Sequence, residues 1–85
     1  MYIIDVRTDV EWNAGHIKDS ILIPYDQIKT RIGEVTVNKS ASIGLYCRSG
    51  RRSGIALKSL QELGYRNVEN LGSLDDARKK LGISP

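Results

Sequence analysis

Short apolar runs alternate with helical patterns along this chain of 85 residues, and this alternation limits the possible folds more than any other feature. Four of the runs have the length of a buried strand, and a helical pattern follows each one. Because strands that are joined through helices lie parallel, the sequence predicts an α/β fold. We expect a small three-layer domain with a central, mainly parallel sheet of four to five short strands flanked by helices. The runs are Tyr2 to Val6, Ile21 to Ile23, Ile43 to Cys47 and a stretch within Tyr65 to Asn70.

Capping residues mark where the helices begin and end. Thr8 and Glu11 have the spacing of a capping box, and Gly15 is expected to end this brief helix. A second helical pattern lies between residues 25 and 33, and a polar surface loop follows at residues 36–42. The best-defined helix ends at Gly64 and has its apolar residues on one face, at Ala56, Leu57, Leu60 and Leu63. A last helix is predicted to start at Ser73 and to end at Gly82.

The size of the chain and its charge narrow the possible classes of protein. We expect residues 1–85 to form one domain, because so short a chain cannot build a second core. No apolar stretch approaches the ~20 residues of a membrane helix, which argues against a membrane protein. The net charge of +3 comes from a local cluster of arginines rather than a stripe, and aromatic residues do not interleave with it. We therefore expect no nucleic-acid partner.

The chain has a single cysteine, Cys47, at the predicted carboxyl end of the third strand. Arg48, Arg51 and Arg52 follow within five residues, and the best-defined helix begins among them. Cationic neighbours and a helix N-terminus both lower the pKa of a thiol, which favours the nucleophilic thiolate. In parallel α/β sheets, ligands collect at the carboxyl ends of the strands. The pattern therefore indicates a reactive cysteine that receives an anionic substrate.

Two simpler interpretations were weighed against this one. A lone cysteine after an apolar strand is often a small buried hydrophobe, and a run of arginines is often only a solvated surface. Three arginines beside one thiol are a poor setting for an inert core residue. Ser49 and Gly50 also form a small turn whose backbone can approach a ligand closely. A single cysteine excludes an internal disulfide and a multi-cysteine metal site, so no metal is expected.

The segment from Cys47 to Arg52 resembles the active-site loop of the rhodanese sulfurtransferases. Further segments fall in the order seen in single-domain members, so the resemblance covers nearly the whole chain. It is most similar to the small periplasmic members of the phage-shock type, which implies a periplasmic location, with the cytoplasm as the alternative. The supporting segments are Ile4-Asp5-Val6-Arg7, Glu11-Trp12 with Gly15-His16-Ile17, Ile23-Pro24, Leu63-Gly64-Tyr65 and Val68 to Gly72.

The resemblance implies a thiosulfate:cyanide sulfurtransferase that works by double displacement. Cys47 would be the catalytic residue and would hold the transferred sulfur as a persulfide. Thiosulfate is the implied anionic donor, a thiophilic molecule such as cyanide is the acceptor, and no cofactor is needed. We expect a monomer. The implied substrate-binding residues are Arg48, Ser49, Gly50, Arg51, Arg52 and Ser53.

The length of the loop separates this chain from related cysteine phosphatases and arsenate reductases. Those enzymes have a loop one residue longer, with an arginine six positions after the cysteine. Ser53 occupies that position here, whereas Arg52 lies five positions after Cys47. The shorter loop favours sulfur transfer over phosphate chemistry.

Asp5, Arg7 and His16 are expected to support the site. Asp5 and Arg7 lie at the carboxyl end of the first strand, and the resemblance implies that they hold the active-site region. His16 could act as a general base for the cysteine. The resemblance instead favours a histidine that stabilises its loop. Trp12 and Tyr46 are predicted to pack in the core.

Three positions depart from the family pattern. Asp19 and Ser20 replace a common Gly-Ala and are expected to alter only a turn, whereas Ser73 replaces a glycine and could narrow the pocket or add a hydrogen bond there.

Two other functions stay open. The chain could instead deliver persulfide sulfur to a protein partner. It could also be a redox sensor, for which an exposed thiol of low pKa is suitable.

Overall fold

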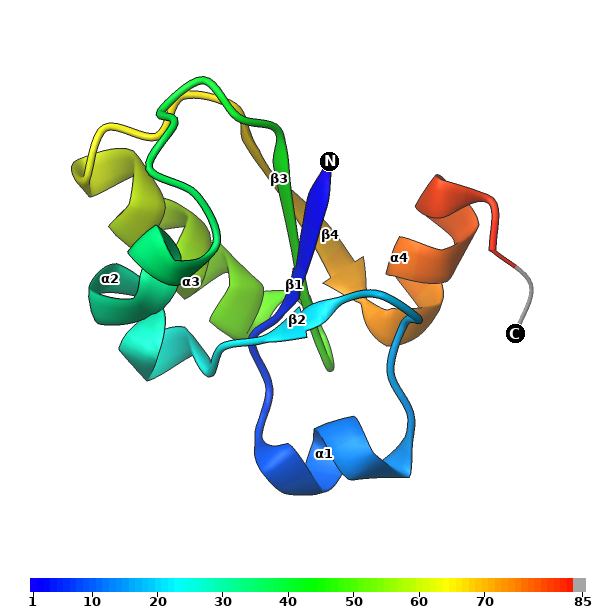
Figure 1. Ribbon diagram of the computed structural model, residues 1–85. Coiled ribbons are helices and arrows are strands. Elements are labelled where there is room, and N and C mark those ends of the chain that lie inside the picture. Colours follow the sequence, from blue (N-terminus) through cyan, green and yellow to red (C-terminus); the bar gives the residue numbers. More distant parts are fainter. Residues whose placement is uncertain (84–85) are drawn as a thin grey trace.

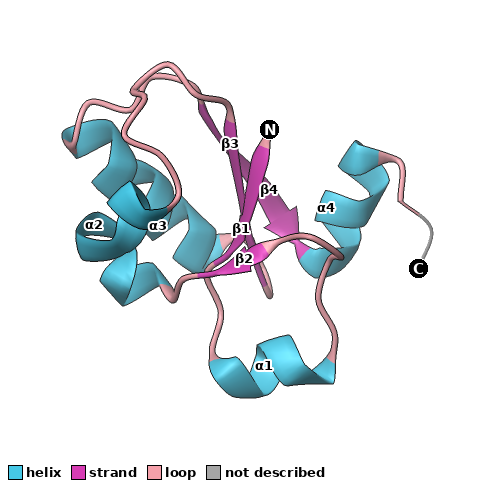
Figure 2. Ribbon diagram, viewed as in Figure 1, coloured by secondary structure: helices cyan, strands magenta, loops and turns pink. Residues whose placement is uncertain are grey.

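Strands and helices alternate through residues 1–83, which the computed structural model describes (Figure 1, Figure 2). In chain order the elements are β1 (Tyr2–Asp5), α1 (Asp9–Ala14), β2 (Ile21–Leu22), the 3-10 turn η1 (Tyr25–Gln27), α2 (Ile28–Arg31), the 3-10 turn η2 (Ile32–Glu34), β3 (Ile43–Cys47), α3 (Arg51–Glu62), β4 (Val68–Ser73) and α4 (Leu74–Leu81). The strands form one parallel sheet in the order β2-β1-β3-β4. This arrangement confirms the predicted α/β class. No helix among the described residues is long and apolar enough to cross a membrane.

Helices cover both faces of the sheet, as predicted. Figure 1 shows α2 and α3 on one side of the strands, α4 on the other, and α1 beyond the end of β1. Successive side chains of a strand point to opposite faces, so β3 contributes to two cores. Leu45 and Cys47 belong to the cluster that packs with α2 and α3, whereas Tyr46 belongs to the cluster under α4. The cysteine therefore faces α3.

An irregularity in the pairing of β3 with β4 affects the site directly. Leu45 pairs with Asn70, but the next residue, Tyr46, pairs with Gly72, so Leu71 is an additional residue in β4. Such a bulge changes the direction in which nearby side chains point. Leu71 packs in the cluster under α4, while the side chain of Asn70 forms hydrogen bonds toward α3. The apolar side chain of Leu71 is thus buried on one face of the sheet, and the polar side chain of Asn70 is hydrogen-bonded on the other.

The helix caps agree with the sequence, while some element boundaries do not. Thr8 and Ser73 each form a complete capping box, and Gly15 and Gly82 cap the ends of α1 and α4. The segment predicted as one helix between residues 25 and 33 is broken into η1, α2 and η2. The fourth strand extends three residues beyond the predicted stretch, to Ser73.

Trp12 does not pack in the core, which corrects the expectation from the sequence. Helix α1 contributes no buried residue, because it lies outside the two layers of helices that cover the sheet. The indole of Trp12 instead stacks on the ring of His16, with ring centroids 3.5 Å apart. Leu63 also lies outside its predicted helix face, since α3 ends at Glu62 and Leu63 is exposed.

Candidate active site

Cys47 is the last residue of β3, and the loop from Arg48 to Gly50 connects it to α3. The chain reverses within this short loop because Gly50 adopts a left-handed conformation, with φ +93°, that glycine reaches without strain. Gly50 also occupies the N-cap position of α3 and offers no side chain to cap the helix. The free backbone N–H groups of the first helical turn therefore point toward the loop, and the thiol lies among them.

The sulfur of Cys47 accepts a hydrogen bond from the backbone N–H of Gly50 at 2.9 Å. The side chain is completely buried, and burial by itself raises the pKa of a thiol. Hydrogen bonds from the Ser53 hydroxyl and from the backbone N–H groups of Ser53, Ser49 and Gly50 outweigh that effect and lower the pKa of Cys47 below its usual value. The loop thus stabilises a thiolate through the Ser53 hydroxyl and through backbone N–H groups.

Asn70 holds this loop from the neighbouring strand β4. Its side-chain oxygen accepts hydrogen bonds from the Ser53 hydroxyl at 2.7 Å and from the backbone N–H of Gly72 at 2.9 Å. Its side-chain N–H donates to the carbonyl of Gly50 at 3.0 Å. One amide therefore connects two of the residues that contact the sulfur of Cys47, namely Gly50 and Ser53.

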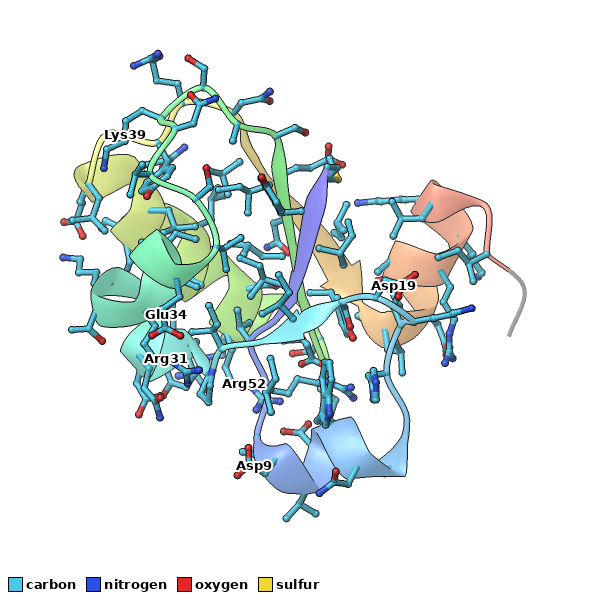
Figure 3. The ribbon with its side chains drawn as sticks, viewed as in Figure 1. Asp9, Asp19, Arg31, Glu34, Lys39 and Arg52 are labelled. Carbon is cyan, nitrogen blue, oxygen red and sulfur yellow. The ribbon has the colours of Figure 1, made fainter. Side chains whose placement is uncertain are left out.

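The three arginines of the loop have different surroundings. Arg48 and Arg51 are exposed and form no ion pair within residues 1–83. Arg52 is half-buried, and its guanidinium donates two hydrogen bonds to the carboxylate of Glu11, at 2.7 and 2.9 Å. Figure 3 shows Arg52 extending from α3 toward α1. Arg52 therefore connects the two helices, while Arg48 and Arg51 keep their charges open to solvent.

Glu11 receives hydrogen bonds from two elements. Besides the pair with Arg52, its carboxylate accepts from the backbone N–H and the hydroxyl of Thr8 in the capping box of α1. The hydrogen bonds with Arg52 lower the pKa of Glu11 to about 2, against the smaller opposing effect of burial. The carboxylate stays ionised at neutral pH and fixes α1 beside the cysteine loop.

Asp5 and Arg7 form a buried ion pair below the loop. The guanidinium of Arg7 donates to both carboxylate oxygens of Asp5, with the shortest distance 2.7 Å, and also to the carbonyl of Gly15. The Asp5 hydrogen bond raises the pKa of Arg7 against the effect of burial, so the cation is retained. The pair joins the end of β1 to the end of α1, and Arg7 also lies 5.4 Å from the ring of Tyr46.

Comparison with known proteins identifies this arrangement. Residues 1–79 match the family described as Rhodanese-like domain. The chain belongs to the rhodanese-like family. The resemblance seen in the sequence is therefore confirmed. Relatives of this rhodanese-like chain are named sulfurtransferases, which is the activity that the sequence predicts.

Several relatives are similar over most of the rhodanese-like domain. Thiosulfate sulfurtransferase PspE of Escherichia coli is 40% identical over 73 residues, which cover 86% of this chain and 70% of PspE. A sulfurtransferase of Allochromatium vinosum is 38% identical and is matched over 95% of this chain and 76% of its own length. A solved structure of a rhodanese with anions from E. coli has a TM-score of 0.85 and 39% identity, with 88% of each chain covered.

The rhodanese-like domain also matches part of a larger protein. The adenylyltransferase and sulfurtransferase uba4 of Ogataea parapolymorpha is 35% identical over 81 residues. The match takes in 94% of this chain but only 21% of uba4. This chain therefore corresponds to a small part of a protein that is named for two activities.

The side chains of His16 and Ser73 each form a hydrogen bond with a nearby residue of the chain. The Nδ1 atom of His16 lies 2.9 Å from the carbonyl oxygen of Trp12, and the ring is exposed. The hydroxyl of Ser73 accepts from the backbone N–H of Asp76 and caps α4. Asp19 lies in a turn at φ +67°, and the Ser20 hydroxyl donates to the carbonyl of Ile17, so both belong to the turn before β2.

Glu11 and Asn70 are contacts of the site that the sequence analysis did not assign. In the sequence, Glu11 is marked by its spacing from Thr8, which is the signal for a capping box, and by its place in a segment that resembles the rhodanese family. No local pattern indicates its contact with Arg52, 41 residues away. Asn70 faces the same side of the sheet as its partner Leu45, toward α3, and no local pattern in the sequence indicates its hydrogen bonds with the cysteine loop.

Proposed function

We propose that this rhodanese-like domain is a thiosulfate sulfurtransferase that carries the transferred sulfur on Cys47. The observation that supports this most directly is the 2.9 Å hydrogen bond from the Gly50 N–H to the sulfur, in a loop that lowers the pKa of Cys47. The name of PspE as a thiosulfate sulfurtransferase supports the choice of donor. The short loop, with Ser53 six positions after the cysteine, supports sulfur rather than phosphate as its cargo.

The reaction has two displacement steps that balance without an oxidant or reductant. In the first, the Cys47 thiolate attacks the outer sulfur of thiosulfate. A new S–S bond forms, the S–S bond of thiosulfate breaks, and sulfite leaves with the electron pair. In the second, cyanide attacks the outer sulfur of the persulfide, thiocyanate forms, and the electron pair returns to the Cys47 thiolate.

The loop contributes both attraction of the donor and stabilisation of sulfur anions. Arg48 and Arg51 carry open positive charges that raise the local concentration of a dianion. The backbone N–H groups around Cys47 stabilise the thiolate and, after transfer, the persulfide. The loss of one such aimed donor costs on the order of 3 kcal/mol in comparable sites. Since the side chain of Cys47 is completely buried, the reaction with thiosulfate requires a movement that exposes the sulfur.

Intact mass and steady-state kinetics test this proposal together. We expect incubation with thiosulfate to add one sulfur atom to the wild-type chain and none to Cys47→Ala. We expect parallel double-reciprocal lines for thiosulfate and cyanide, as double displacement requires. Ser59→Ala is a matched control, since it changes a residue of α3 outside the cysteine loop. A folded wild-type protein with no added sulfur and negligible turnover would refute the proposal.

Delivery of the persulfide sulfur to a protein partner is the second candidate. It is favoured by the match to part of uba4, where the domain stands beside an adenylyltransferase. Rapid loading with sulfur but slow transfer to cyanide would support this alternative.

The periplasmic location and the monomeric state that the resemblance implies stay predictions, which cell fractionation and analytical ultracentrifugation would check.

A further inference from the structure

The side-chain amide of Asn70 is held in one orientation by its hydrogen bonds. The backbone N–H of Gly72 can only donate, so it must face the amide oxygen, at 2.9 Å. The carbonyl of Gly50 can only accept, so it must face the amide nitrogen, at 3.0 Å. The hydroxyl of Ser53 lies 2.7 Å from the same amide oxygen. Because that oxygen can only accept, Ser53 has to be the donor in this pair.

Ser53 has one proton and two neighbours that can take it. Its oxygen lies 2.7 Å from the amide oxygen of Asn70 and 3.4 Å from the sulfur of Cys47. While the hydroxyl donates to Asn70, it turns a lone pair to the sulfur, which suits a thiol because S–H can donate. A thiolate gains a hydrogen bond from Ser53 only when the proton leaves Asn70. Since the Ser53 side chain is completely buried, bulk water does not replace the lost contact.

Sulfur transfer changes the charge on the sulfur atom that Ser53 contacts. In the proposed persulfide, the negative charge lies on the outer sulfur, and the sulfur of Cys47 is neutral and bonded on both sides. Such a sulfur is a weak acceptor. The Ser53 proton therefore forms the better hydrogen bond with Asn70, as it does beside the thiol. Of the three forms of Cys47, only the thiolate draws the proton away from Asn70.

We propose that Asn70 is a positioning residue that holds the Ser53 proton and so disfavours the free thiolate of Cys47 relative to the thiol and the persulfide. The part that concerns the persulfide rests on the proposed function. In the reaction, loading restores the hydrogen bond between Ser53 and Asn70, and unloading breaks it again. Asn70 therefore favours the loaded domain. It exchanges no proton with the sulfur, and the bonds that form and break are those of the two displacement steps.

The charged groups around Cys47 stay the same whichever way the Ser53 hydroxyl points. They are Arg48 and Arg51 in the loop, Arg52 paired with Glu11 of α1, and the pair of Asp5 and Arg7 at the end of β1. Neither Asn70→Ala nor Ser53→Ala removes any of these charges. A change in the pKa of Cys47 between such variants therefore reports on hydrogen bonds rather than on charge.

A double-mutant cycle on the pKa of Cys47 tests the proposal. The four proteins are wild type, Asn70→Ala, Ser53→Ala and the double variant. Because the chain has a single cysteine, the far-ultraviolet absorbance of the thiolate measures this pKa, with Cys47→Ala as the blank. We expect Asn70→Ala to raise the acid dissociation constant about fivefold, the effect of one hydrogen bond released to the thiolate. With Ser53→Ala already present, Asn70→Ala should have no effect.

A purely structural role of Asn70 gives a different result. Asn70 also holds the carbonyl of Gly50, whose N–H donates to the sulfur. A loosened loop would misdirect that N–H and raise the pKa of Cys47, with or without Ser53. A raised or unchanged pKa in Asn70→Ala, or an equal shift in both backgrounds, would overturn the proposal.

Two further variants of β4 and its approach control for folding and for packing. Asn70→Leu removes the acceptor but nearly keeps the volume of the side chain, so it should lower the pKa of Cys47 in the same way. It decides the question if Asn70→Ala does not fold. Asn67→Ala replaces an exposed asparagine before β4 and should keep the wild-type pKa.

Equilibration with thiosulfate and sulfite separates this inference from the proposed function. Intact mass gives the loaded fraction at each ratio of the two anions, at a pH above the pKa of Cys47. We expect Asn70→Ala to need a ratio of thiosulfate to sulfite about fivefold higher for half loading. Equal ratios in the two proteins would contradict the preference for the persulfide. If wild type does not load at all, the proposed function fails, and the pKa cycle still decides whether Asn70 holds the Ser53 proton.

Discussion

Ser53 donates a hydrogen bond of 2.7 Å to the side-chain oxygen of Asn70, while its own oxygen lies 3.4 Å from the sulfur of Cys47. A hydroxyl has one proton to donate. When Cys47 is a thiol, its S–H can donate to Ser53, which then donates to Asn70. A thiolate can only accept, so the Ser53 hydroxyl must turn from Asn70 toward the sulfur to stabilise it. Asn70 therefore competes with the thiolate for one proton.

Ser53→Ala should raise the pKa of Cys47, because it removes the hydroxyl that donates to the thiolate. The rate of alkylation by iodoacetamide near neutral pH should fall several-fold, and its rise with pH should shift to higher pH. Ser59→Ala, in the same helix but outside the cysteine loop, is the control and should match wild type. Identical pH profiles for Ser53→Ala and wild type would show that the backbone N–H groups are sufficient.

The lowered pKa of Cys47 also predicts how stability depends on pH. A group whose pKa is lower in the folded state contributes stability that is present above its unfolded pKa and is lost as pH falls through its folded pKa. Wild type should therefore gain stability, relative to Cys47→Ala, as pH rises between those two values. Urea denaturation of both proteins across this interval measures the difference. A constant difference would contradict a lowered pKa.

Asn70→Ala should lower the free energy of unfolding by about 1–3 kcal/mol. The change removes the acceptor for Ser53 and Gly72 and the donor to the Gly50 carbonyl, in a part-buried position. Urea denaturation would measure the loss. Asn67→Ala replaces an exposed asparagine near the start of β4 and should stay within about 0.5 kcal/mol of wild type. Equal stabilities of the two variants would exclude Asn70 as a support of the loop.

The sequence was most informative where the structure depends on local contacts. The capping box at Thr8, the helix start at Ser73 and the strand that ends at Cys47 each depend on neighbouring residues, and all three are confirmed. Burial of the thiol was not foreseen, since it depends on how the loop folds over β3. The redox-sensor alternative, which an exposed thiol suits, would need the same exposure of the sulfur as the reaction with thiosulfate.

Contacts between distant segments could not be predicted in this way. Arg52 was expected to bind substrate, yet in the structure its guanidinium is paired with Glu11 from α1. The side chain of Asn70 reaches the loop because β4 pairs with β3 and puts Asn70 opposite Leu45, on the side of the sheet that α3 covers.

Glu11→Gln should destabilise the domain by about 1 kcal/mol at neutral pH, allowing for solvent screening. The pKa of Glu11 is about 2 in the folded state and ordinarily 4.5, so its contribution is fully present above the ordinary value and is lost as pH falls toward 2. The stability difference between wild type and Glu11→Gln should therefore shrink in acid. Thermal denaturation at several pH values measures it. Glu69→Gln, an exposed control in β4, should show no such trend.

Asp5→Ala should be the most damaging of these substitutions, because it leaves the Arg7 guanidinium buried without its carboxylate partner. Breaking a buried ion pair from one side typically costs about 3–5 kcal/mol. Asp26→Ala removes an exposed carboxylate and should have little effect on urea denaturation. The double variant Asp5→Ala/Arg7→Met removes the orphaned charge and should recover part of the loss. A double variant no more stable than Asp5→Ala would mean that Arg7 acts mainly through its bond to the Gly15 carbonyl.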